Sequence, residues 1–100
     1  MSKGKKYTYN PEHMTAIAEQ FGDCAKILEE AIEQNEAAKI NYEENYEGQA
    51  EEITTDTFGK IEEHLKLLVQ CCQTTEAYVR DCLTSMQEAD SKIANSYQGG

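Results

Sequence analysis

The chain has 100 residues, with 19 acidic against 9 basic side chains and a formal net charge of −10 at pH 7. Leu, Ile, Val and Phe together supply only 16 of the 100 residues, a composition that by itself is typical of disordered chains. This length allows one domain with a small core. The first question is therefore whether the few apolar residues are spaced so that folding buries them together.

Composition also excludes several classes of protein. No apolar run approaches the roughly 20 residues that span a bilayer, so we expect no stable membrane insertion. Residues 1–10 contain lysines but no apolar segment, so no Sec-type signal peptide is expected. An acidic surface lacks the clustered Lys and Arg that phosphate contacts need, which argues against nucleic-acid binding. One proline and six glycines favour helices over a loop-rich or all-β chain.

A first helix is predicted over about residues 11–44. Asn10 fits an N-cap, Pro11 the first helical position and Glu12 the first turn. Apolar residues then recur at spacings of three and four, the pattern of a heptad stripe. This first stripe comprises Met14, Ile17, Phe21, Cys24, Leu28, Ala31, Asn35, Ala38 and Tyr42. Its one polar member, Asn35, is of a kind that more often fixes register than serves chemistry.

A turn at about residues 45–49 and a second helix over about residues 50–95 follow. Asparagines and Gly48 supply the turn chemistry, because glycine adopts the backbone angles at which a helix can end sharply. The second helix keeps the same apolar spacing, and its last residues are expected to fray. The second stripe comprises Phe58, Ile61, Leu65, Leu68, Cys72, Thr75, Val79, Cys82, Met86, Ala89 and Ile93.

The predicted fold is an all-α antiparallel two-helix hairpin that forms a single domain over residues 1–100. The two stripes are expected to meet along one shared seam. Apolar residues beside the stripes, such as Ile27, Leu67 and Val69, widen them beyond what so thin a hairpin can bury. We therefore expect a four-helix bundle on dimerisation. The residues predicted to form the partner interface are Phe21, Leu28, Ile61, Leu65, Leu68 and Val79.

The turn and the C-terminal part of the second helix carry a resemblance to a known family. Tyr46-Glu-Gly48-Gln-Ala50 resembles the aromatic-x-Gly turn of the WXG family of small type VII secretion proteins, with Tyr46 in place of tryptophan. Met86-Gln-Glu-Ala-Asp90 has the spacing of the family's second signal, an aromatic residue followed four positions later by an acid, with Met86 in the aromatic's position. The resemblance covers residues 11 to about 95. The replaced aromatics also fit the divergent subgroup that partners LXG toxins.

The resemblance implies a non-enzymatic type VII secretion substrate or targeting partner. Such a protein would dimerise, with itself or with the helical N-terminal domain of an LXG-type toxin. Met86 and Asp90 would form a C-terminal export signal read by the secretion ATPase. The protein would be cytoplasmic before export and then secreted or at the cell surface. The alternative is a cytosolic coiled-coil adaptor without an export role, in which Gly48 is an ordinary turn glycine and Met86 a core residue.

Four cysteines invite a disulfide or metal interpretation. A hairpin centred near residue 47 places Cys24 opposite Cys71 or Cys72, so a bridge formed after export is one hypothesis. The other is that Cys24, Cys72 and Cys82 act as small apolar core residues. No CxxC spacing supports a metal site. We predict no cofactor and no catalytic residues, because phosphate loops and nucleophile–base pairs are absent from the sequence and the acids fall on outward helix positions.

Overall fold

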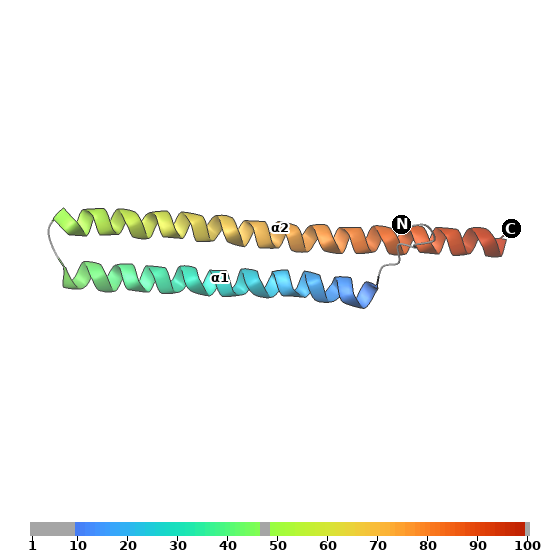
Figure 1. Ribbon diagram of the computed structural model, residues 1–100, viewed down its shortest axis with the longest axis horizontal. Coiled ribbons are helices and arrows are strands. Elements are labelled where there is room, and N and C mark those ends of the chain that lie inside the picture. The colour runs from blue at the N-terminus through green and yellow to red at the C-terminus, as the bar shows by residue number, and fades with distance from the viewer. Residues whose placement is uncertain (1–9, 47–48, 100) are drawn as a thin grey trace, which may run out of the picture.

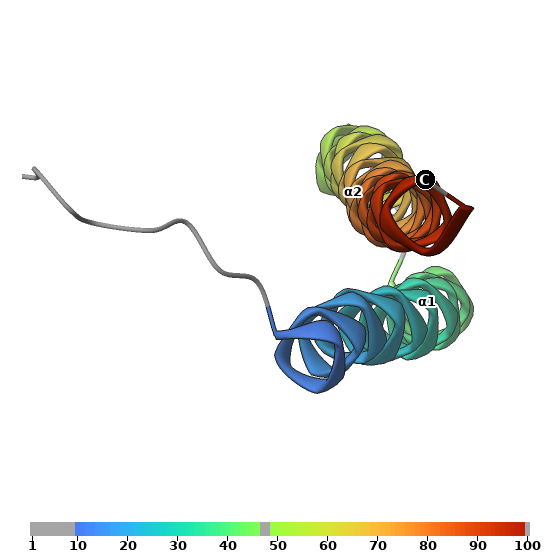
Figure 2. The same cartoon turned by 90° about the vertical axis from the view of Figure 1, so that its right-hand side faces the viewer.

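The computed structural model describes residues 10–46 and 49–99, and it describes side chains at 10–46 and 52–94. Helix α1 (Pro11–Asn45) has 35 residues and helix α2 (Gln49–Gly99) has 51. The two helices run antiparallel, side by side (Figure 1), and no strand occurs among the described residues. An end-on view shows a single layer of two helices (Figure 2). The predicted all-α helical hairpin is confirmed, and α2 continues past the expected end at residue 95 to Gly99.

Helix α1 begins as its sequence predicts. Asn10 has an extended backbone, and its Oδ1 accepts a hydrogen bond from the backbone N–H of His13 at 3.1 Å. Pro11 is the first helical residue, where its missing N–H costs nothing, and Glu12 stands in the first turn. The cap satisfies a donor that would otherwise lack a partner within the helix.

Helix α1 ends at Asn45 and the chain leaves it in an extended conformation. Tyr46 has φ −134° and ψ 145°, and its N–H donates to the Tyr42 carbonyl at 3.0 Å. The Asn45 amide donates to both the backbone oxygen and the Oδ1 of Asn41, each at 2.7 Å. These bonds satisfy carbonyls of the last turn. Gly48 lies outside the described residues, so its role in the turn stays a prediction.

The helices meet along a narrow line of contact, which we call the seam. Among the described residues the only buried apolar side chains are Ala18, Ala25 and Val69, and no large side chain is fully buried. Small residues allow the helices to approach closely. A Cβ on Gly22 would lie 3.1 Å from the Glu76 carboxylate oxygens, so α2 reaches the backbone of α1 at this level. The seam is therefore tight but contains little apolar volume.

The seam follows the predicted stripes only in part. Buried Ala18 and Ala25 each lie one residue beyond the stripe members Ile17 and Cys24, and Cys24 is exposed. On α2, buried Val69 likewise replaces exposed Leu68. The other stripe members belong to both the predicted stripe and the observed contact line. The two therefore differ by a rotation of each helix by about 50°, half the angle between successive residues. Stripe members such as Phe21, Leu28 and Leu65 therefore stay at the seam, whereas others, such as Cys24 and Leu68, lie to one side of it.

Polar groups enter the seam between its middle and the turn. The Asn35 amide donates to the Phe58 carbonyl across the seam at 2.9 Å. Lys39 and Glu62 are half-buried nearby, and Glu62 forms a 2.7 Å ion pair with Lys66. The hydrogen bond and charge of Lys66, with a smaller contribution from Lys39, hold the pKa of Glu62 below its ordinary value. The seam thus fixes the pairing of the helices by directional contacts as well as by apolar burial.

We expect Ala25→Leu to lower the free energy of unfolding by about 1–3 kcal/mol, because the added side chain forces apart two closely packed helices. The matched change Ala37→Leu, at an exposed position of the same helix, should shift stability by less than about 0.5 kcal/mol. Urea denaturation followed by circular dichroism measures both. Equal effects of the two variants would show that Ala25 does not lie at a tight contact.

Asn35→Ala should lower the free energy of unfolding by about 0.5–1.5 kcal/mol, because it removes the hydrogen bond to the Phe58 carbonyl across the seam. The neighbouring change Gln34→Ala affects an exposed side chain and serves as the control. Thermal denaturation at matched protein concentration measures the difference. A wild-type melting curve for Asn35→Ala would contradict a stabilising role for this bond.

Candidate functional site

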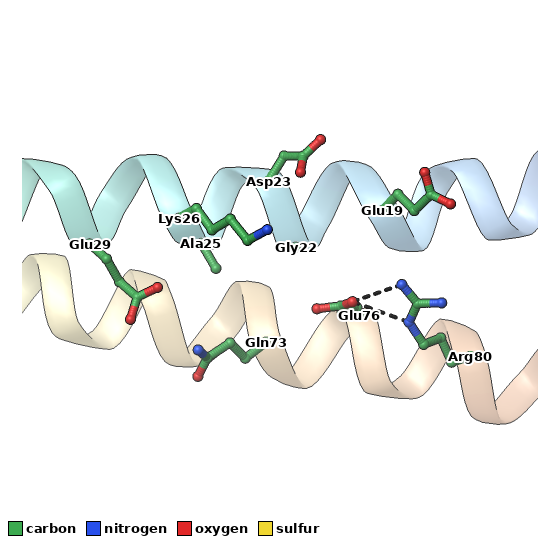
Figure 3. Close-up of a pocket in the computed structure, with 9 residues that line it drawn as sticks. All are labelled: Glu19, Gly22, Asp23, Ala25, Lys26, Glu29, Gln73, Glu76 and Arg80. Atoms are coloured by element: carbon green, nitrogen blue, oxygen red, sulfur yellow. Dashed lines mark hydrogen bonds and ion pairs between the residues drawn. The ribbon is translucent and has the colours of Figure 1, made fainter.

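One side of the hairpin is polar, and we call it the polar face. It contains a shallow hollow to which both helices contribute (Figure 3). The Arg80 guanidinium donates from Nε and Nη2 to Glu76 Oε2, at 3.1 and 2.9 Å, and the Glu76 carboxylate covers Gly22. The residues that line the hollow are Glu19, Gly22, Asp23, Ala25, Lys26, Glu29, Gln73, Glu76 and Arg80. The hollow is open to solvent and is lined by both acidic and basic side chains. These residues contribute to the pairing of the two helices, and they include no nucleophile–base pair.

The opposite side is the apolar face, and it consists of the outward members of the two predicted stripes. Near the turn, Ala38 and Tyr42 of the first stripe and Phe58 of the second line one shallow pocket. We define the apolar face as Ile17, Cys24, Ala31 and Ala38 of α1 with Ile61, Leu68, Thr75 and Cys82 of α2.

The predicted interface residues gather on this apolar side. Ile61 and Leu68 lie in the face itself and are 41% and 49% exposed. The other four are half-buried between the face and the seam: Phe21, Leu28, Leu65 and Val79. The core of this hairpin is small, and large aliphatic side chains remain exposed on this side. Exposed aliphatic side chains of this kind are typical of a protein–protein contact.

An aromatic cluster closes the end of the hairpin near the turn. The rings of Tyr42 and Tyr46 stack with centroids 4.5 Å apart, and Phe58 of α2 lies 6.2 Å from Tyr42 at a tilt of 57°. The Thr54 hydroxyl lies 3.3 Å from the Tyr42 hydroxyl. Tyr46, in the predicted turn motif, therefore packs on Tyr42, and Tyr42 makes the ring contact with α2. Ala50 lies in α2, with its side chain outside the described part.

Met86 and Asp90, the predicted export signal, lie one helical turn apart on α2. This part of α2 extends beyond the first residue of α1 (Figure 1). Every described side chain from Thr84 to Ala94 is exposed, and Met86 is 39% exposed. An apolar side chain and a carboxylate therefore stand together on a segment that α1 does not cover.

The four cysteines are free thiols. Cys24 and Cys71 are exposed, whereas Cys72 and Cys82 are half-buried. A hydrogen bond between Tyr78 and Cys82 raises the pKa of Tyr78 above its ordinary value. The contact of Gly22 with Glu76 places Cys24 close in level to Cys72, so the bridge from Cys24 to Cys72 or Cys71 stays a prediction. Within the residues that the structure describes, no group of three or more His, Cys, Asp or Glu could hold a metal ion.

Sequence reasoning missed the close approach of the Glu76 carboxylate, which Arg80 holds, to Gly22. The signal was present, since Glu76 and Arg80 have the spacing of a helical ion pair and Gly22 is an unfavourable residue inside a helix. This sequence signal can be interpreted only once the register of α1 against α2 is known. Over its described residues, neither helix has a segment sufficiently long and apolar to cross a membrane.

Comparison with known proteins identifies the family. A family model described as proteins of 100 residues with WXG, named WXG100, matches residues 6–91. Comparisons with curated proteins and with solved structures find no match. The matched range contains the turn with Tyr46, the paired parts of both helices and the Met86–Asp90 segment. The chain therefore belongs to the WXG100 family, whose members are small helical proteins associated with type VII secretion.

Proposed function

We propose that this protein is a type VII secretion substrate or targeting partner that dimerises and contributes a C-terminal export signal. WXG100 proteins are non-enzymatic helical proteins that are secreted by this route and typically form dimers. The hairpin geometry fits that role, because the apolar face offers a contact surface and the polar face carries a small solvated hollow. The protein is then cytoplasmic before export and secreted or at the cell surface afterwards.

The observation that carries the proposal is the position of Met86 and Asp90. Both lie in the C-terminal part of α2, which runs on past the start of α1 (Figure 1), and every described side chain from Thr84 to Ala94 is exposed. A secretion ATPase can contact a methionine and a carboxylate on one side of such a helix without separating the two helices of the hairpin. The export signal and the dimer contact are therefore separate surfaces.

The small core supports the need for a partner. Only three apolar residues are buried among those described, and Ile61 and Leu68 remain about half open. Covering them removes apolar surface from water, which stabilises the complex by roughly 25 cal/mol per Å². The partner is a second copy or the helical N-terminal domain of an LXG-type toxin.

Asp90→Ala should abolish export while leaving dimer formation intact, because the carboxylate lies outside the paired part of the hairpin. Deletion of residues 86–100 should have the same effect. Glu88→Ala removes a neighbouring exposed carboxylate and is the matched control, which we expect to be exported normally. Immunoblots of culture medium and cell pellet measure export, and size-exclusion chromatography with light scattering measures the dimer.

Normal export of both the Asp90→Ala and the truncated protein would contradict the signal assignment. Loss of export for Glu88→Ala as well would show that this segment acts through its overall charge instead of through Asp90.

Export also exposes the thiols to an oxidising medium, and we expect Cys24 to bridge Cys72 or Cys71 there. Each bridge forms one S–S bond while the two thiols give two protons and two electrons to an external oxidant such as molecular oxygen. Non-reducing peptide mass spectrometry of the secreted protein should show a cross-linked peptide that contains Cys24. Recovery of only free thiols would contradict the bridge.

A further inference from the structure

The C-terminal segment of α2, residues 86–99, carries an apolar stripe past the point where α1 begins. The Glu76 carboxylate approaches Gly22 closely, which sets the level of one helix against the other. Because the helices are antiparallel, Pro11 then lies at about the level of Gln87. From there the segment runs on past the start of α1 (Figure 1). The register thus brings the N-terminal end of α1 to the beginning of this segment.

One side of the C-terminal segment is apolar and open to solvent. Met86, Ala89 and Ile93 recur at spacings of three and four, so they share one side of the helix. All three are exposed, Met86 at 39% and Ile93 at 56%. The segment ends at the carbonyl end of a 51-residue helix whose last turn contains no basic residue. This end carries the negative pole of the helix dipole, near which cations are stabilising.

Residues 1–9, which we call the N-terminal segment, have the complementary composition and lie outside the described part of the chain. Their charged and aromatic members are Lys3, Lys5, Lys6, Tyr7 and Tyr9, with no acid among the nine residues. Residues 81–99 contain three acids and one base. Counted away from α1, the tyrosines come first and the lysines follow. That order matches an apolar stripe followed by the negative end of a helix.

From this match we propose that the N-terminal segment docks along the C-terminal segment of α2, with its tyrosines on the apolar stripe and its lysines at the helix end. An extended residue advances ~3.3 Å against ~1.5 Å in a helix, so each residue before Asn10 passes about two residues of α2. The two tyrosines then fall at about the levels of Ala89 and Ile93. The lysines reach the last turn of α2.

The chemistry of the two segments suits this contact. Alternate residues of an extended chain share a side, so Tyr7 and Tyr9 can both face α2. Aromatic rings pack well on methionine sulfur and on aliphatic side chains, and the tyrosine hydroxyls can stay in water. Lysines near the carbonyl end of α2 interact favourably with its dipole, and salt screens this attraction. The contact therefore has an apolar part and a salt-dependent part.

The hollow on the polar face is the other acidic surface near this end of the hairpin. The chain would have to reverse direction at Asn10 to reach it, because the hollow begins at Glu19 of α1. Lys26 and Arg80 already place positive charge there, and its lining has no large apolar side chain to receive a tyrosine. The C-terminal segment of α2 therefore suits the N-terminal segment better.

The docking itself depends only on the sequence and the fold, whereas its consequence for export rests on the proposed function. Met86 belongs both to the apolar stripe and to the proposed export signal. The docked N-terminal segment therefore covers part of that signal, and a receptor that binds Met86 has to displace residues 1–9 first.

Hydrogen exchange followed by mass spectrometry tests the docking on the full chain. A lone helix as short as the C-terminal segment is marginally stable in water, so its amides exchange fast unless another segment packs on it. We expect the amides of residues 88–99 to exchange about threefold or more faster in two variants than in the wild type. One variant is Tyr7→Ser/Tyr9→Ser, and the other is Lys5→Gln/Lys6→Gln.

The matched control is Lys26→Gln/Lys60→Gln, which removes the same charge from two exposed positions of the paired helices. Residues 88–99 should exchange at the wild-type rate in this control. Raising the salt concentration to 1 M shortens the Debye length to about 3 Å. It should therefore bring the wild type toward the lysine variant and change the lysine variant less.

Three results would overturn the docking. The first is wild-type exchange of residues 88–99 in both the tyrosine and the lysine variants. The second is faster exchange confined to residues 19–29 and 73–80, which would place the N-terminal segment at the hollow. The third is protection of residues 88–99 that falls on dilution, which would show that residues 1–9 of another copy supply it.

The export assay separates this inference from the proposed function. Normal export of Asp90→Ala, with faster exchange in the tyrosine and lysine variants, overturns the export signal and leaves the docking. Loss of export in Asp90→Ala, with wild-type exchange in both of those variants, overturns the docking and leaves the export signal.

Discussion

Two helices can share only one line of contact, and the rest of this structure depends on that constraint. The line here is occupied by Ala18, Ala25 and Val69, with polar groups of Asn35, Lys39 and Glu62 entering it toward the turn. Such a seam brings the helices close together but removes little apolar surface from water. Over its described residues the hairpin consequently buries only a small apolar core, and most of its large apolar side chains stay partly open to solvent.

The division of the molecule into an apolar and a polar side follows from the arrangement of charge along each helix. On the polar side Arg80 holds Glu76 over Gly22, and Lys66 pairs with Glu62. These contacts are exposed and individually weak in water. These ion pairs matter for their direction, because they hold the carboxylates away from the side that carries Ile61 and Leu68. Net charge keeps the chain soluble, while its distribution decides which surface another protein can approach.

Much of this fold was predictable from the sequence. The N-cap at Asn10, two long helices and their antiparallel pairing follow from local rules that need no tertiary information. The position of the seam does not, because Met14, Phe21 and Leu28 belong to both the predicted stripe and the observed contact line. To choose between the stripe and the contact line, one must know that two alanines, Ala18 and Ala25, allow the helices a closer approach. Their neighbours Ile17 and Cys24 are larger. The same holds for the contact of Gly22 with Glu76, whose partners are distant in sequence and meet only in the correct register.

The overhang of α2 beyond α1 has a thermodynamic consequence. The C-terminal part of α2 runs on past the start of α1 (Figure 1), and a single helix of about 14 residues is marginally stable in water. Ordering it against a receptor therefore carries an entropic cost that lowers affinity for a given contact area. In the export role proposed above, such a segment suits brief, reversible docking, in which a transport machine engages its cargo and releases it again without unfolding the paired body of the hairpin.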